Sequence, residues 1–68
     1  MEQKLIRMAS DVQVEAKLAV QVLEDMKNGK MEGTKENAKN LALKHIRLAN
    51  EAQEKLSDAL AEEVARNG

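Results

Sequence analysis

The chain has 68 residues, enough for one domain and near the lower limit at which a single hydrophobic core keeps a chain folded. It contains no cysteine, which excludes disulfides and thiolate metal sites. It also lacks proline and aromatic residues, so its core must consist of leucine, isoleucine, valine, methionine and many alanines. The 11 basic and 12 acidic residues nearly balance, which argues against a nucleic-acid partner.

No apolar run approaches the roughly 20 residues that span a bilayer, and no charged-then-apolar leader opens the sequence. We therefore expect neither a signal peptide nor a transmembrane segment, no membrane partner, and a cytoplasmic location if the protein is natural.

The segment 28–34 is the one interior break that the sequence offers, because glycine occurs elsewhere only at position 68. Gly29 can adopt the left-handed conformation that ends a helix, and Thr34 is a suitable N-cap for the next helix. Strong helix formers dominate on both sides, and a connection this short makes the two helices antiparallel neighbours. We expect one helical-hairpin domain over 1–68, with helix 1 at about 2–28, a loop at 29–33 and helix 2 at about 34–66.

Apolar residues in each expected helix follow alternating steps of three and four, the heptad spacing of helices that pack against one another. Many of these positions hold alanine, which permits close approach. The predicted seam is Leu5, Ala9, Val12, Ala16, Ala19, Leu23 and Met26 in helix 1, and Ala38, Ala42, His45, Ala49, Ala52, Leu56 and Ala59 in helix 2.

Helix 2 carries a second row at the same spacing, with apolar ends and a polar middle. A hairpin covers one seam per helix, so this row stays exposed in a single chain, and an exposed apolar row of this length usually marks an interface. The predicted fold is an all-α antiparallel hairpin that assembles with itself into a four-helix bundle, as a homodimer, with a trimer of hairpins as the alternative. The expected interface is this second row (Leu43, Ile46, Asn50, Gln53, Ser57, Leu60 and Val64) together with Leu41, His45 and Leu48.

Charge along helix 2 favours an antiparallel pairing of the copies. Residues 30–47 contain five basic and two acidic residues, whereas residues 48–68 contain two basic and five acidic ones. Exposed ion pairs contribute less than about 1 kcal/mol each, but they select orientation. We therefore expect a two-fold axis that sets each basic half against an acidic half.

The polar middle of the second row, Asn50, Gln53 and Ser57, admits three interpretations. These residues line a pocket, form a hydrogen-bond network, or lie solvated at the edge of the interface. An unpaired buried polar group costs about 1–3 kcal/mol, so a network penalises misaligned assemblies. We expect the network, which fixes register and partner number.

His45 is the only imidazole in the chain. A metal site would need ligands one turn away, where Leu41, Ala42, Leu48 and Ala49 stand, and we find no carboxylate on its face. As an axial haem ligand it would need only a copy of itself from a second chain and room between them. The other interpretations are a boundary histidine hydrogen-bonded to a neighbour and a pH-sensitive switch. We expect no cofactor and no metal, and His45 is the one candidate cofactor-binding residue.

Catalysis has little support in the sequence. Ser10 and Ser57 have no histidine at a spacing that implies a dyad, and NGKMEG (28–33) lacks the phosphate-loop pattern. We expect a structural or protein-interaction module and no enzyme. The functional alternatives are a haem-type bundle using His45 from two chains and a docking hairpin for another protein's helix.

Two capped helices, one glycine loop, regular seams, a polar layer between apolar layers and the tail ALAEEVARNG (59–68) resemble de novo designed helical-hairpin homo-oligomers with buried hydrogen-bond networks. The resemblance implies a self-assembling four- or six-helix bundle with no biological substrate, for which a cellular location does not apply. Glu63 departs from the pattern because it falls on the seam. Val14 and Leu18 depart because they lie on the face expected to be solvated, and they indicate a further contact in a trimer of hairpins.

Overall fold

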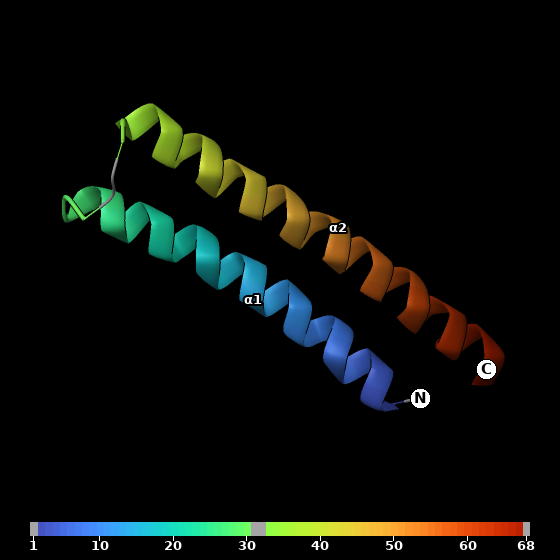
Figure 1. Cartoon of the computed structure of the whole chain (residues 1–68). Helices are drawn as coiled ribbons and strands as arrows, with labels where there is room; N and C mark the ends of the chain where they lie inside the picture. The colour runs from blue at the N-terminus through green and yellow to red at the C-terminus, as the bar shows by residue number, and fades with distance from the viewer. Residues whose placement is uncertain (1, 31–32, 68) are drawn as a thin grey trace.

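The protein is a hairpin of two antiparallel α-helices (Figure 1). The computed structural model describes residues 2–30 and 33–67, and within them it contains α1 (Glu2–Lys27) and α2 (Lys35–Asn67) and no strand. The start of α1 and the end of α2 lie at the same end of the molecule, opposite the loop (Figure 1). The helices begin and end within one residue of the expected positions. Met31 and Glu32, part of the expected loop, lie outside the described residues.

A Schellman motif around Gly29 ends α1. The amide of Lys30 donates to the carbonyl of Asp25 at 2.8 Å, and the amide of Gly29 donates to the carbonyl of Met26 at 3.2 Å. Gly29 has a φ of +70°, in the left-handed region that glycine enters without steric penalty. The predicted role of Gly29 as the terminator of the first helix is confirmed.

Thr34 caps the start of α2, as predicted. Its Oγ1 accepts a hydrogen bond from the amide of Asn37 at 3.1 Å, and its carbonyl accepts one from the amide of Ala38 at 3.2 Å. The bond to Oγ1 satisfies the amide of Asn37, which has no partner within the helix, and the bond to Ala38 is the first backbone bond of the helix. Glu36 in the first turn adds a negative charge where the helix dipole favours one.

The predicted seam of α2 is confirmed, whereas the predicted seam of α1 is wrong at three positions. All seven predicted seam residues of α2 are buried or half-buried, and Glu63 continues the row. In α1, Met8, Glu15 and Val22 face α2 in place of the exposed Ala9, Ala16 and Leu23, while Leu5, Val12, Ala19 and Met26 lie in the seam as expected.

Both sets of α1 residues have heptad spacing, and they differ by a rotation of the helix about its axis. The sequence favours the all-apolar set, because the alternative brings a carboxylate into the seam. Glu15 lies in the seam because its carboxylate is hydrogen-bonded to His45 on α2. Met8 also brings a larger side chain to the seam than Ala9, whose place it takes, whereas Val22 brings a smaller one than Leu23.

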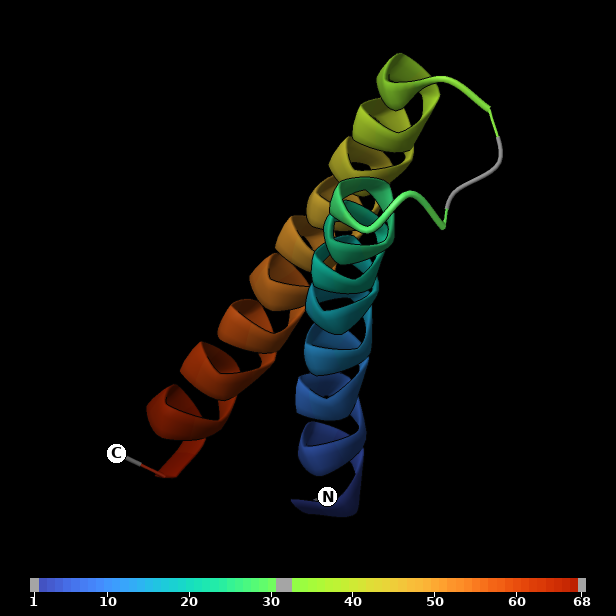
Figure 2. The same cartoon turned by 90° about the vertical axis from the view of Figure 1, so that its left-hand side faces the viewer.

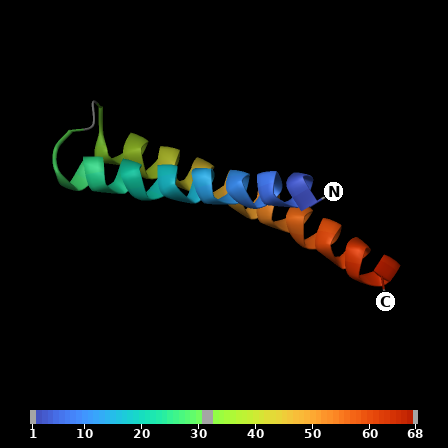
Figure 3. The same ribbon diagram turned by 90° about the horizontal axis from the view of Figure 1, so that it is seen from below.

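The core is small and is made mainly of alanine. The buried apolar residues are Ala19, Val22, Ala38, Ala42 and Ala49, and no large side chain is fully buried in the part of the chain that the structure describes. These residues lie toward the loop, whereas the seam residues near the termini are half-buried. Figures 2 and 3 show the helices diverging toward the termini. Leucine and methionine in that half of the seam hold the helices farther apart than alanine does.

The hairpin is long and thin. Its extents are 51 × 17 × 12 Å and its radius of gyration is 15.6 Å. A compact domain of this length would have a radius of gyration of about 11 Å. The two helices therefore form a single layer that leaves both sides of the hairpin uncovered.

Replacing Gly29 by alanine should lower the free energy of unfolding by about 1–2 kcal/mol, because an L-residue is strained in the left-handed region. No atom lies within 4 Å of an added Cβ, so the loss reflects backbone strain and not a clash. Denaturant unfolding followed by far-UV circular dichroism measures it, at one protein concentration because association changes apparent stability. Gly29→Asn is the control, since asparagine tolerates this conformation, and an equal loss in both variants would contradict the explanation.

Candidate interaction surface

Glu15 and His45 form a polar pair between the two helices. His45 Nδ1 lies 2.7 Å from Glu15 Oε2, and the two side chains are 19% and 26% exposed for His45 and Glu15 respectively. A carboxylate only accepts hydrogen bonds, so Nδ1 carries the proton and donates it. Among the residues described, this is the only side-chain hydrogen bond that joins α1 to α2.

His45 is thus a boundary histidine with a hydrogen-bonded neighbour, one of the roles considered from the sequence. Its own helix face holds no carboxylate, as the sequence indicates, and the carboxylate that binds it comes from α1. Within 2–30 and 33–67 no three His, Cys, Asp or Glu side chains gather as a metal site. The geometry supports a structural role in which the pair fixes the register of the helices.

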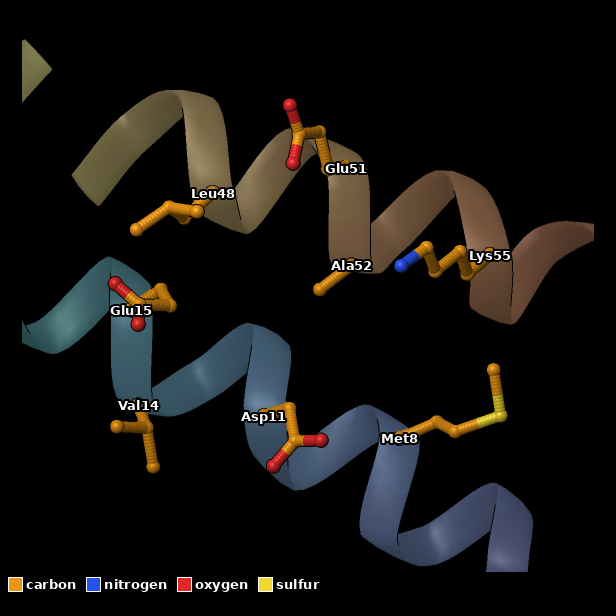
Figure 4. Close-up of a pocket in the computed structure, with 8 residues that line it drawn as sticks. All are labelled: Met8, Asp11, Val14, Glu15, Leu48, Glu51, Ala52 and Lys55. Carbon is orange, nitrogen blue, oxygen red and sulfur yellow. The ribbon is translucent and has the colours of Figure 1, made fainter. Parts of the chain in front are cut away.

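A shallow groove of about 310 Å³ lies beside this pair, between the middle parts of the two helices (Figure 4). Four of its eight lining residues are charged, and Figure 4 shows them around the opening. Small-molecule pockets are mostly apolar with few polar groups, so this lining does not resemble one. The lining residues are Met8, Asp11, Val14, Glu15, Leu48, Glu51, Ala52 and Lys55.

The structure divides the expected interface between two opposite flanks of α2. Leu41 and Leu48 precede seam residues by one position and lie on the groove side, where Leu48 lines the groove with Val14. His45 lies in the seam itself. The second row follows the seam by one position and lies on the other flank, and all of its residues are exposed: Leu43, Ile46, Asn50, Gln53, Ser57, Leu60 and Val64. One copy docked on one side cannot cover both sets.

A matching row runs along α1. It also follows the seam by one position, it includes the three residues wrongly assigned to the seam, and all its members are exposed. Sequence reasoning missed it as a row, although its signal, uncharged residues at steps of three and four, is present in the sequence. Its residues are Ile6, Ala9, Gln13, Ala16, Val20 and Leu23.

The two rows lie on the same side of the hairpin. A step of one residue turns the side chain by about 100° about the helix axis. Two antiparallel helices turn in opposite senses when viewed from one end, so the same step from a shared seam leads to the same side. We call the two rows together the uncharged face, because none of their thirteen residues is charged.

The opposite side, which we call the charged face, consists of the residues that precede the seam by one position. Nine of its fifteen residues are charged. It contains the groove of Figure 4 and includes the apolar residues Val14, Leu18, Leu41 and Leu48. Its residues are Lys4, Arg7, Asp11, Val14, Leu18, Gln21 and Asp25 on α1, and Asn37, Leu41, Lys44, Leu48, Glu51, Lys55, Asp58 and Glu62 on α2.

Comparison with protein-family models, with curated proteins and with solved structures gives no match. Neither of the two helices, over the residues described, has the length and apolar character needed to cross a membrane. The features that distinguish this hairpin are the uncharged face and the Glu15–His45 pair.

Replacing Glu15 and His45 by alanine, singly and together, should reveal a coupling of about 0.5–1.5 kcal/mol, the usual contribution of one hydrogen bond. Each single variant leaves a polar group in the seam without its partner, and the double variant removes both groups. Denaturant unfolding at one protein concentration gives the free energies. The control cycle uses Asp11 in place of Glu15, because Asp11 lies one turn away on α1 and does not bond His45. Equal coupling in both cycles would show that the pair has no specific role.

Proposed function

We propose that this chain is a self-associating helical hairpin, which forms a four-helix bundle as a homodimer and acts as a structural or protein-interaction module. The observation that carries the proposal is the exposure of its large apolar side chains. Eleven leucine, isoleucine and valine residues of the described chain are exposed, from Leu48 at 37% to Val64 at 71%. Exposed apolar side chains that follow helix faces are typical of an interface between helices.

Surface area supports the same proposal. The single hairpin exposes 5551 Å², whereas a folded monomer of its mass exposes about 4,200 Å². The excess is about 1,300 Å², and a stable interface of standard size buries about 800 Å² on each partner. Association through one side of the hairpin would therefore bring the exposed area near that of an ordinary folded protein.

The docking-hairpin alternative uses the same apolar surface for a helix of another protein. The two proposals differ in the behaviour of the pure chain: a docking hairpin stays a monomer until its partner is added. A trimer of hairpins differs from the dimer in mass alone.

Light scattering should give a mass of twice 7.5 kDa across a concentration series. Protein concentration must come from refractive index, because the chain has no tryptophan or tyrosine. The thermal midpoint should rise with protein concentration, because only the folded chains associate. A well-ordered monomer that persists at high protein concentration would contradict the proposal.

Replacing Asn50 and Gln53 together by leucine should keep the helicity but broaden the distribution of assembly states. The loss of the polar layer removes the penalty on misaligned partners. Native mass spectrometry and light scattering report the distribution. Replacing both residues by serine keeps the layer polar and should leave one species. If the leucine variant gives a single sharp species as well, these two residues do not set register.

A further inference from the structure

We infer that two copies meet antiparallel through the uncharged face, and that Gln13 of α1 completes the polar layer formed by Asn50, Gln53 and Ser57. The inference rests on the proposed self-association and deepens it. It names the surface, the orientation and one specificity-determining residue that the pattern of helix 2 alone does not contain.

The distribution of charge selects the face. A second copy removes the face that it covers from water, and burying an unpaired charge is costly. The thirteen residues of the uncharged face include no charge, and only Lys27 and Lys39 stand at its loop end, whereas docking on the charged face would dehydrate up to nine charged residues. The exposed apolar residues of the uncharged face come from both helices and include Ile6 (62%), Val20 (55%) and Val64 (71%).

The polar layer lies near the middle of the uncharged face. The contact between Glu15 and His45 places Gln13, two residues earlier on α1, at the level of residue 47 of α2, because the helices run in opposite directions. Gln13 therefore lies between the levels of Ile46 and Asn50. The polar groups span levels 47 to 57 of a helix that runs from 35 to 67.

A two-fold axis through this layer, perpendicular to the long axis of the hairpin, superposes the two faces almost completely. The polar layer of one copy then meets the polar layer of the other, so amide and hydroxyl groups can pair across the axis. The apolar end near the loop meets the apolar end near the termini. The residues at these two ends are Val20, Leu23, Leu43 and Ile46 near the loop, and Leu60 and Val64 near the termini, while Ile6 lies beside the polar layer at the level of residue 54.

The ends of the face differ in charge, which favours the antiparallel orientation. Beyond the ends of the two rows, Lys27 and Lys39 stand near the loop and Glu2 stands near the termini. Residues 14–48 contain seven basic and five acidic residues, whereas residues 2–13 and 49–67 contain four basic and seven acidic ones. An antiparallel copy sets the basic half against the acidic half twice, and a parallel copy sets like against like.

Two matched pairs of substitutions test the face. Val20→Glu with Ile46→Glu puts one charge on each helix of the uncharged face, and Leu18→Glu with Leu48→Glu does the same on the charged face. All four side chains are exposed in the single hairpin, so neither pair removes a core contact. At the concentration where the parent chain is a dimer, the first pair should halve the mass and the second should leave it unchanged.

The reverse result would overturn the inferred face and leave self-association intact. A parent chain that is a monomer would instead refute the proposed function on which the inference rests. The two failures are therefore distinguishable in one light-scattering series. Gln13→Ala should broaden the assembly distribution, whereas Gln21→Ala on the charged face should not, and equal behaviour of these two variants would remove Gln13 from the polar layer.

The orientation is tested on an otherwise intact chain. Because the chain has no cysteine, Lys30→Cys gives one nitroxide label per copy at the loop end. Pulsed electron paramagnetic resonance should find the two labels separated by a distance close to the 51 Å length of the hairpin. A parallel dimer would place them roughly 10–20 Å apart, a distance of one or two helix diameters, and would overturn the orientation. Glu54→Cys, near mid-length, is the control, since its labels lie at similar distances in both arrangements.

Discussion

The close approach of two helices along an alanine-rich seam is the constraint on which the rest of the structure depends. Four of the five residues that are buried in the described part of the chain are alanine. Alanine allows the backbones to come close, but it removes little apolar surface from water, and burial stabilises by only about 25 cal/mol per Å². The larger apolar side chains therefore lie on the flanks of the seam, where one hairpin cannot cover them. A single folded chain therefore leaves in water apolar surface whose burial would stabilise it further.

The Glu15–His45 pair specifies the register of the two helices, which the small side chains of the seam specify only weakly. A slip of one helix along the other by a heptad would exchange alanine for alanine at two seam positions of α2, Ala42 for Ala49 and Ala52 for Ala59. Such a slip separates Glu15 from His45 and leaves two polar groups near the core without partners, which costs free energy. The pair thus fixes the register that the alanines do not, and the register sets the level of Gln13 relative to Asn50.

The two sides of the hairpin differ in charge, because one consists of the residues that follow the seam by one position and the other of those that precede it. Residues that follow the seam are uncharged from Ile6 to Leu23 on α1 and from Leu43 to Val64 on α2, whereas nine of the fifteen residues that precede it are charged. Both sides of this single layer are uncovered in one chain, so the charge of each side indicates which one a second copy covers and which one stays in water. Val14, Leu18, Leu41 and Leu48 are apolar islands among the charges, and a trimer of hairpins is the arrangement that would cover them as well.

The sequence by itself determined the features that depend on neighbouring residues. Gly29 and Thr34 place the helix ends through local sterics and local hydrogen bonds. The seam of α2 differs from the second row of the same helix, which has three polar residues in its middle. Only the tertiary structure decided the rotation of α1, because two sets of its residues have the same heptad spacing. The facing helix selects between them through the bond from His45 to Glu15, thirty residues away in the chain. In this rotation Ala9, Ala16 and Leu23 lie outside the seam and belong to the α1 row. The uncharged face therefore follows from the packing of both helices and not from the pattern of either helix alone.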